Sequence, residues 1–358
     1  MKIAFHIHSL TKGGAERAVT NLANEFSSIG HEVFVITSIK NESEYKLKKE
    51  VTRIVLHDGD NKDSYWFRYV ILSKKLRKVC NNYKFDVLIP FISGSSFRAF
   101  LATRGMTTKV IASVRNDPNY EYAGIIGNII GKKILPLVDG CVFQTNDAKR
   151  WFPNKLQEKS VIIPNAINPI FFDAIRHPKF NRVVAFGRLA KQKNHAMLIR
   201  AFALVKNEIP EAELLIFGIG NLYNETKQLI EQLKLQECVF LMGETANVKG
   251  ELEKADLFVL SSDFEGMPNA LMEAMAAGTP CVSTDCPCGG PKSLIKDKEN
   301  GILVPIKDIE KMAEAIKCTL INRSLNEKIG RQAAMSSKEL TSENISNKWI
   351  HYIESIIN

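Results

Sequence analysis

The chain has 358 residues, of which 45% are hydrophobic and 24% charged, a composition typical of globular proteins rather than of disordered or fibrous ones. That length exceeds a single ordinary core and predicts two domains of roughly 170 residues each. The formal net charge of +9 belongs to the first half, since residues 1–170 carry +10 and residues 171–358 carry −1, which indicates an anionic partner for the first half.

Short strands alternate with helices along almost the whole chain. The first strand is expected over 3–7, a glycine turn follows it, and 15–28 has the pattern of a helix. Further strands are expected over 31–37, 86–91, 109–113, 140–144, 160–163, 182–186, 212–217, 239–242, 257–261, 280–283 and 301–304. Strands separated by helical stretches predict βα units and parallel sheets covered by helices on both faces.

The segment 164–169, with a proline at each end, is the best linker candidate, because a new βα series begins after it. We therefore expect an α/β protein with two doubly wound Rossmann-like domains, residues 1–168 and 169–340. A helix over 341–358 is a candidate to pack back onto the first domain. Ligands of such sheets bind beyond the carboxyl ends of the strands, so the interdomain cleft is the expected site.

Two glycines, Gly13 and Gly14, stand between the first strand and the first helix. They allow a tight turn and a close approach of the backbone to a ligand, and a helix start offers N–H groups to an anion. A simple β-to-α turn explains them equally well. The chain has neither a GxGxxG dinucleotide fingerprint nor a P-loop.

A basic loop, 187–194, follows the first strand of the expected second domain. Its Arg188 and Lys193 leave the carboxyl end of that strand and could bind a diphosphate without a metal ion. The alternative is a solvated basic loop that binds no ligand.

An acidic segment, 265–273, follows the strand expected over 257–261. Glu265 lies at the end of that strand, and Pro268 suits the first turn of a helix that continues to about residue 277. Glu273 lies in an otherwise apolar part of this helix, where a buried acid needs hydrogen-bond donors. Ligand hydroxyls would supply them, and a structural salt bridge is the alternative.

These segments together are similar to a known family. The chain resembles glycosyltransferase family 4 over nearly its whole length, in Gly13-Gly14-Ala15-Glu16-Arg17, in Gly187-Arg188-Leu189 with Lys193, in the segment from Glu265 to Glu273, and in Asn300-Gly301-Ile302-Leu303-Val304. The resemblance implies a GT-B fold and a nucleotide-sugar donor. It also implies transfer with retention of anomeric configuration, without a metal ion or cofactor.

The resemblance further implies roles for single residues. Arg188 and Lys193 would neutralise the donor diphosphate, Glu265 would contact the hydroxyls of the donor sugar, and Glu273 those of the ribose. Catalysis would rest on Arg188, Lys193 and Glu265. Main-chain groups near the donor phosphates and sugar would come from Gly13, Gly14, Gly266, Met267, Pro268 and Asn269.

The loop after the strand over 109–113 departs from the family, because it reads Arg115-Asn116-Asp117-Pro118 where many members have a histidine. This loop resembles that of the members that build exopolysaccharide and capsule repeat units. Arg115 and Asn116 are therefore acceptor-side candidates, with an Asx-Pro turn as the alternative. His8, at the end of the first strand, is a third candidate, although a packed or solvated histidine is the simpler interpretation.

No metal site is expected. Asp58-Gly59-Asp60 matches the DxD motif of metal-dependent GT-A glycosyltransferases, but it falls in a polar turn of the basic half, which favours a loop. The seven cysteines include no CxxC pair, and unpaired thiols in a reducing compartment account for them.

An amphipathic stretch over 64–83 bears on membrane contact. Its apolar residues recur at helical spacing with lysines and arginines mostly opposite, which is typical of a core-facing helix and also suits an anionic lipid surface. The sequence has no recognisable signal peptide or transmembrane span. We therefore expect a cytoplasmic protein, with peripheral binding to the cytoplasmic face of the inner membrane as a further candidate location.

The sequence thus predicts an enzyme that moves a hexose or N-acetylhexosamine from a UDP-sugar to a growing oligosaccharide in bacterial-type capsule or lipopolysaccharide biosynthesis. The expected acceptor is linked to undecaprenyl diphosphate, which would account for the basic first half. A GT-B-fold nucleotide-sugar 2-epimerase and a nonenzymatic sugar-binding or assembly protein are the alternatives. No nucleic-acid-binding motif occurs, and nucleic acid is not an expected partner.

Overall fold

A computed structural model of the chain describes residues 1–11, 13–57 and 65–358, without the side chains of residues 65–68. The chain forms two compact units, one of Met1–Ala166 with Ser342–Asn358 and one of Ile167–Thr341. The boundary between them lies inside the expected linker segment, 164–169. The Asp58-Gly59-Asp60 motif lies outside the described residues.

The first unit is built on a seven-stranded parallel sheet with the strand order β3-β2-β1-β4-β5-β6-β7. Its strands are β1 (Lys2–Ile7), β2 (Glu32–Thr37), β3 (Thr52–Val55), β4 (Val87–Pro90), β5 (Lys109–Ser113), β6 (Gly140–Phe143) and β7 (Ser160–Ile162). The strand order reverses between β1 and β4. The loops that follow these two strands therefore diverge at the edge of the sheet where α/β proteins bind ligands.

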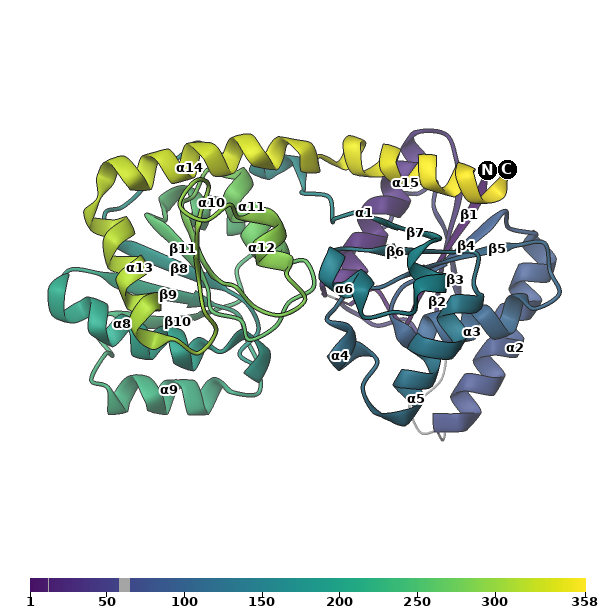
Figure 1. Cartoon of the computed structure of the whole chain (residues 1–358), viewed down its shortest axis with the longest axis horizontal. Coiled ribbons are helices and arrows are strands. Elements are labelled where there is room, and N and C mark those ends of the chain that lie inside the picture. Colours follow the sequence, from purple (N-terminus) through teal and green to yellow (C-terminus); the bar gives the residue numbers. More distant parts are fainter. Residues whose placement is uncertain (12, 58–64) are drawn as a thin grey trace. The chain divides into compact units, whose positions relative to one another are not determined.

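Helices pack on this sheet (Figure 1). They are α1 (Gly14–Ser28), α2 (Tyr65–Tyr83), α3 (Ser93–Thr103), α4 (Pro118–Glu121), α5 (Gly124–Ile129), the short helices η1 (Ile130–Ile134) and η2 (Leu135–Leu137), α6 (Asn146–Arg150), α7 (Asn154–Gln157) and α15 (Ser342–Ile357). The C-terminal helix α15 packs against α1. Its Trp349 is fully buried, with its ring centroid 6.4 Å from that of Phe91. The end of the chain is thereby anchored in the first unit.

The second unit carries a six-stranded parallel sheet with the strand order β10-β9-β8-β11-β12-β13. Its strands are β8 (Arg182–Phe186), β9 (Glu213–Phe217), β10 (Val239–Gly243), β11 (Leu257–Leu260), β12 (Cys281–Thr284) and β13 (Ile302–Val304). Its helices are η3 (Pro169–Phe171), η4 (Lys191–Lys193), α8 (His195–Glu208), α9 (Tyr223–Gln232), α10 (Val248–Lys254), α11 (Asn269–Ala276), α12 (Gly290–Leu294), α13 (Ile309–Ile321), α14 (Arg323–Ser337) and η5 (Lys338–Leu340). Here the order reverses between the neighbours β8 and β11.

Side chains of the central strands alternate between two apolar clusters of the second unit. Val183 of β8 belongs to the cluster that contains Phe202 of α8, and Val184 belongs to the cluster that contains Leu271 of α11. This alternation follows from the two-residue period of a strand. It fixes α8 and α11 on the sheet and so positions the loops that precede them.

The predicted α/β class with two parallel-sheet Rossmann-like units is confirmed. Every strand expected from the sequence is present, with each end within one residue of the expected position. The sequence prediction missed β3, a four-residue strand that, among the described residues, pairs only with β2 and lies at the edge of its sheet. Its Thr-Arg-Ile-Val sequence is no more than half-buried, so it lacks the apolar run that marks the inner strands.

Candidate functional site

Two loops meet where the second sheet reverses its strand order, one after β8 and one after β11. The Asp263 N–H donates to the carbonyl of Gln192 at 2.8 Å, and the Gln192 side chain donates to the carbonyl of Phe264 at 3.0 Å. Ser261 Oγ donates to the carbonyl of Lys193 at 2.9 Å. The basic loop and the acidic segment that the sequence singled out are thus parts of one local structure.

Lys193 and Glu265 form an ion pair inside this structure. The Lys193 Nζ lies 2.5 Å from Glu265 Oε1, and Ser262 Oγ donates to the same oxygen at 2.7 Å. The exposed fractions of the two charged side chains are 18% and 8%, so the pair is largely shielded from water. The carboxylate is thereby fixed in place. A diphosphate that binds Lys193 has to share this ammonium with Glu265.

Arg188 is an exposed cation on the same basic loop. The next residue, Leu189, is buried, and its N–H donates to the carbonyl of Ile219 at 3.0 Å, which fixes the backbone beside the end of β9. Arg188 pairs with no carboxylate in the part of the chain that the structure describes. Its charge is therefore available to an anionic ligand, in contrast to that of Lys193.

The acidic segment leads from β11 into α11, which begins at Asn269. Glu265 and the three residues that follow it, Gly266, Met267 and Pro268, are buried. A Cβ added to Gly290 would stand 1.8 Å from the carbonyl oxygen of Gly266, so α12 packs directly against this loop. The positive end of the α11 dipole lies at the loop and favours a negative charge there.

Glu273 occupies the second turn of α11 and is 4% exposed. Its neighbours Met272 and Ala274 are buried as well, so the acid lies on a buried helix as the sequence predicts. It stands one helical turn beyond Asn269 and therefore shares a helix face with the start of the helix.

His195 at the start of α8 was not singled out from the sequence. Its Nε2 lies 3.3 Å from the carbonyl oxygen of Gly187, and its Nδ1 is buried without a hydrogen-bond partner among the described residues. Burial lowers the pKa of His195 to about 4, so the ring is neutral and donates from Nε2. The only sequence signal for it is its place directly after Lys193 and Asn194.

Gly13 is the N-cap of α1, and Gly14 is its first helical residue. A Cβ added to Gly13 would stand 2.2 Å from Glu16 Oε2, so a larger residue at this position would push that carboxylate aside. The Glu16 side chain therefore already lies at the positive end of α1, as in a capping box. A phosphate that binds at this helix start has to displace it.

The guanidinium of Arg115, an acceptor-side candidate, packs against aromatic side chains of the first unit. Its guanidinium lies 4.6 Å from the ring centroid of Phe91 and 5.4 Å from that of Trp349, and it donates to Ser113 Oγ at 2.6 Å and Asn165 Oδ1 at 3.0 Å. Burial lowers its pKa to about 9. These contacts favour a role in holding β5, α15 and the end of the first unit together.

The loop after β5 contains the Asx turn that the sequence left as the alternative. Asp117 Oδ1 accepts from the N–H of Asn119 at 2.9 Å and caps α4. The N–H of Asn116 donates to Glu121 Oε2 at 3.2 Å, while its side chain is half-buried. His8 is exposed just beyond the end of β1.

Glu121, at the end of α4, was also missed from the sequence. Burial raises its pKa to about 7, although nearby main-chain N–H groups of Arg115, Asn116 and Ser93 oppose the shift. Perturbed carboxyls of this kind occur at binding and catalytic sites. No sequence pattern marks it, because its helix has only four residues.

The described part of the amphipathic stretch 64–83 forms α2, and the apolar side of this helix faces the core of the first unit. Leu72 and Leu76 are buried and the helix packs against α3, while Lys74, Lys75 and Lys78 are exposed. The core-facing interpretation therefore holds for this stretch. No helix within the described residues is long and apolar enough to cross a bilayer, and no three metal-ligating side chains cluster there.

Comparisons with known proteins match both halves of the chain. Residues 12–170 match the family model described as glycosyltransferase family 4, and residues 168–335 match that of glycosyl transferases group 1. A Campylobacter jejuni GalNAc-α-(1→4)-GalNAc-α-(1→3)-diNAcBac-PP-undecaprenol α-1,4-N-acetyl-D-galactosaminyltransferase is 29% identical, with 100% of this chain and 99% of the relative covered.

A second C. jejuni relative, an N-acetylgalactosamine-N,N'-diacetylbacillosaminyl-diphospho-undecaprenol 4-α-N-acetylgalactosaminyltransferase, is 27% identical over 98% of this chain and 99% of its own. Among solved structures, Anabaena HepE in complex with UDP and glucose superposes with a TM-score of 0.82 at 16% identity, covering 99% and 100% of the two chains. The structural likeness establishes a shared two-domain fold.

Proposed function

This chain belongs to glycosyltransferase family 4, and we propose that it transfers a hexose or N-acetylhexosamine from a UDP-sugar to an oligosaccharide linked to undecaprenyl diphosphate. It is a hexosyltransferase of surface polysaccharide biosynthesis. The observation that carries the donor assignment is the junction of two loops at the strand reversal of the second sheet. There Arg188, Lys193 and Glu265 come from loops that are hydrogen-bonded to each other.

In this proposal the second unit binds the donor. The diphosphate lies against Arg188 and Lys193, and the Glu265 carboxylate accepts hydrogen bonds from hydroxyls of the sugar. Glu273 accepts hydrogen bonds from the ribose hydroxyls, from its place on the buried helix α11. Main-chain groups of Gly266, Met267, Pro268 and Asn269 line the sugar and β-phosphate at the positive end of α11.

The proposed transfer retains the anomeric configuration. The bond between the anomeric carbon and the β-phosphate oxygen breaks while the acceptor oxygen bonds to the same face of the sugar, and the acceptor proton passes to an oxygen of the leaving diphosphate. Negative charge accumulates on UDP, so stabilising the leaving group is the main catalytic task. Arg188 and Lys193 supply positive charge for that task, and we therefore propose that no divalent metal is needed. Amides at Gly13 and Gly14 approach the donor phosphates once Glu16 has moved aside.

The acceptor half of the proposal rests on charge and on the relatives. Residues 1–170 carry the whole positive excess of the chain, which suits a diphosphate-bearing acceptor. Both C. jejuni relatives are named for acceptors linked to undecaprenol through a diphosphate. Arg115 contributes by holding the first unit together, and Asn116 and His8 remain the accessible acceptor-side candidates.

A lipid-linked acceptor calls for contact with a membrane, and we propose peripheral binding to the cytoplasmic face of the inner membrane. Ile125 on α5 is 81% exposed and Ile129 is 49% exposed, with the exposed Lys133 one turn further on. Exposed isoleucines beside a lysine suit an interface with anionic lipid.

The stereochemistry and the metal requirement are tested together. The product of a reaction run in EDTA with an α-linked UDP-sugar is examined by NMR for the coupling constant of the new anomeric proton. The proposal predicts an α-linkage at an undiminished rate. A β-linked product would contradict retention, and loss of activity that Mg²⁺ or Mn²⁺ restores would contradict metal independence.

A further inference from the structure

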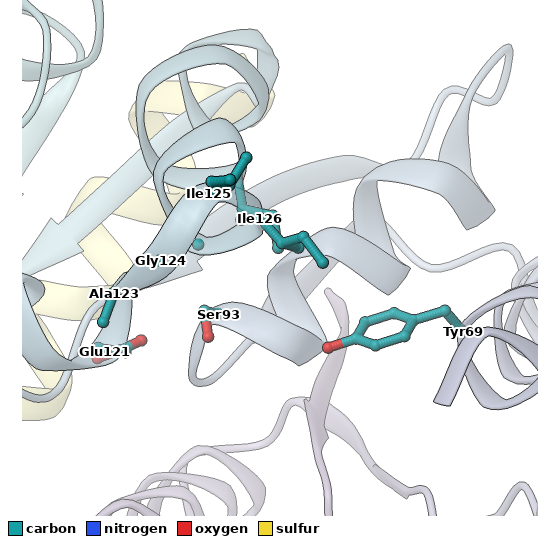
Figure 2. A pocket seen from close by; sticks show the side chains of 9 residues that line it. Tyr69, Ser93, Glu121, Ala123, Gly124, Ile125 and Ile126 are labelled. Carbon is teal, nitrogen blue, oxygen red and sulfur yellow. The ribbon is translucent and has the colours of Figure 1, made fainter. Parts of the chain in front are cut away.

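A cavity of about 550 Å³ opens in the first unit, and all of its lining residues belong to that unit. It is lined by Tyr69 of α2, Ser93 at the start of α3, Glu121 at the end of α4 and residues of the segment 123–130. Its volume lies in the range of small-molecule sites. Figure 2 shows the oxygen atoms of Tyr69, Ser93 and Glu121 directed toward one space, with the isoleucines of α5 on another side of it.

The Glu121 carboxyl has an unused oxygen. Its Oε2 accepts from the N–H of Asn116, whereas its Oε1 is buried and has no hydrogen-bond partner among the described residues. The Tyr122 hydroxyl and the main-chain N–H groups of Arg115 and Ser93 lie close enough to favour the ionised carboxylate, but none of them forms a hydrogen bond to Oε1. A buried carboxyl oxygen without a donor is unfavourable. A ligand hydroxyl would remove that cost.

Two glycines, Gly124 and Gly127, belong to the lining of this cavity. A Cβ added to Gly127 would stand 2.4 Å from the carbonyl carbon of Tyr122, so only glycine lets α5 approach α4 this closely. Gly124 has a φ of +71°, in the left-handed region that favours glycine. The chain therefore turns sharply between α4 and α5, and residues of both helices and of this turn line the cavity.

Buried groups hold Tyr69 in position. The Arg98 guanidinium lies 5.7 Å from the Tyr69 ring centroid, and its Nε donates to His6 Nε2 at 3.2 Å. The His6 Nδ1 donates to the carbonyl of Ile36 at 2.9 Å, so the ring is neutral, and burial lowers its pKa to about 3. A Cβ on Gly94 would approach the Tyr69 hydroxyl at 3.3 Å, which places that hydroxyl against the first turn of α3.

The lining selects the chemistry of the ligand. Three oxygen-bearing side chains from three helices offer hydrogen bonds, and Ile126 and Ile130 offer an apolar surface. A sugar ring presents hydroxyls at its edge and C–H groups on its faces, so it matches both parts. A phosphate or diphosphate would find no cationic side chain among these lining residues, and an anion beside Glu121 would disfavour the ionised form of its carboxyl.

We propose that this cavity binds a sugar residue of the acceptor glycan, with Glu121 accepting a hydrogen bond from one of its hydroxyls. The inference rests on the proposed function for the presence of a glycan acceptor. Ser93 and Glu121 follow β4 and β5, so the cavity lies at the carboxyl ends of these strands, beside the strand reversal of the first sheet. The exposed Ile125 belongs to the same wall, so a sugar near a lipid headgroup could enter from the membrane side.

The test measures sugar binding directly, because it needs no knowledge of the natural acceptor. The full chain is saturated with UDP and titrated with methyl α-glycosides of N-acetylgalactosamine, N-acetylglucosamine, galactose and glucose, and binding is followed by saturation-transfer NMR. We expect a millimolar Kd for at least one glycoside. Glu121→Gln should weaken that binding about tenfold or more. Ala123→Trp, placed on the cavity lining, should abolish it.

Glu42→Gln serves as the matched control, because Glu42 is an exposed carboxylate of the same unit outside the cavity. All four proteins should bind UDP equally. If no glycoside binds the wild-type chain, or if both cavity variants bind it as the wild type does, the cavity is not a sugar site. Displacement of the bound glycoside by geranyl phosphate would point to a lipid site and overturn the inference. Failure of the wild-type chain to bind UDP would contradict the donor proposal and leave the glycoside titration to decide the cavity.

A folding control accompanies the variant. Because burial raises the pKa of Glu121 to about 7, the contribution of this carboxyl to the free energy of unfolding falls as the pH rises from 4.5 through 7, whereas a glutamine makes no such pH-dependent contribution. Glu121→Gln should therefore raise the melting temperature at pH 8 and leave it nearly unchanged at pH 4. A lower melting temperature at both pH values would identify a folding defect, and Ala123→Trp would then decide the inference.

Discussion

The ammonium of Lys193 lies 2.5 Å from Oε1 of Glu265, in a pair that joins the loops of two neighbouring strands. In this pair Lys193 is proposed to bind the donor diphosphate, and Glu265 is proposed to accept hydrogen bonds from the sugar hydroxyls. Arg188 stands outside this pair and is exposed. In the proposed donor site the two cations would therefore have different tasks, since Lys193 is fixed and shared with Glu265 whereas Arg188 is free to bind the phosphate.

Loss of either cation should remove most turnover. Arg188→Ala and Lys193→Ala each delete one positive charge opposite the leaving diphosphate, so kcat should fall by about 10²–10³. Lys191→Ala is the matched control, because Lys191 is an exposed lysine of the same loop that no role is assigned to. Steady-state rates of UDP release measure the effect. Equal rates for Arg188→Ala and Lys191→Ala at saturating acceptor would remove Arg188 from the site.

Glu265→Gln should separate nucleotide binding from sugar use. The substitution frees Lys193 from its carboxylate partner, so UDP should bind at least as tightly as it does to the wild type. The hydrogen bonds from the sugar hydroxyls weaken, and turnover should fall by about 10²-fold. Titration calorimetry with UDP beside turnover of the UDP-sugar gives both numbers. A parallel loss of UDP affinity would show that Glu265 supports the fold of the loop and does not read the sugar.

Glu273→Gln should weaken the binding of UDP and of UDP-sugars to the same extent, because the ribose is common to both. A hydrogen bond to a charged group contributes about 1.5–3 kcal/mol, which corresponds to roughly a 10- to 100-fold rise in Kd. The melting temperature of the variant monitors the buried site. An unchanged Kd for UDP in a folded variant would assign Glu273 to a structural salt bridge.

His6 should make the first unit sensitive to acid. Its folded pKa of about 3 lies below the ordinary value of 6.5, so the unfolded chain takes up the proton first as the pH falls. The contribution of the neutral His6 to the free energy of unfolding is fully present above pH 6.5 and is lost as the pH falls from 6.5 to 3. At pH 5 the loss is about 2 kcal/mol. The neutral His6→Gln should abolish this part of the acid sensitivity.

Tryptophan fluorescence isolates that unit, because Trp66, Trp151 and Trp349 all belong to it. Urea unfolding gives the free energy of unfolding of the wild type and of His6→Gln at pH 7.5 and at pH 5. The double difference is the loss between the two pH values in the wild type minus the loss in the variant. A double difference near zero would mean that His6 titrates normally in the folded protein.

Local sequence patterns predict much of the fold. Apolar runs of four to six residues between helical stretches predict the inner strands, because these strands are buried on both faces. The strand β3 does not follow this pattern, because it lies at the edge of the described sheet and its residues are at most half-buried. The segments with Arg188, Lys193 and Glu265 can be found from the sequence because each follows such a strand.

The non-local contacts could not be predicted. Lys193 and Glu265 are 72 residues apart in sequence, and they meet only because β8 and β11 become neighbours in the sheet. Arg115 is a candidate acceptor-side residue by sequence, yet its guanidinium packs on Trp349 of the C-terminal helix, 5.4 Å from the ring centroid. Glu121 carries no pattern at all, because its burial depends on the turn at Gly124 and the packing of Gly127.

The most direct test of the central claim is a time course of UDP release from UDP-N-acetylgalactosamine, with the mass of the product measured alongside. It is run with and without undecaprenyl-diphosphate-linked GalNAc-α-(1→4)-GalNAc-α-(1→3)-diNAcBac, the acceptor named for the C. jejuni relative. A panel of other UDP-sugars and shorter glycans on the same carrier extends the assay. The account predicts UDP release that depends on acceptor and a product heavier by one sugar residue. Conversion of the UDP-sugar to an epimer without acceptor, or no UDP release with any donor and acceptor of the panel, would contradict it.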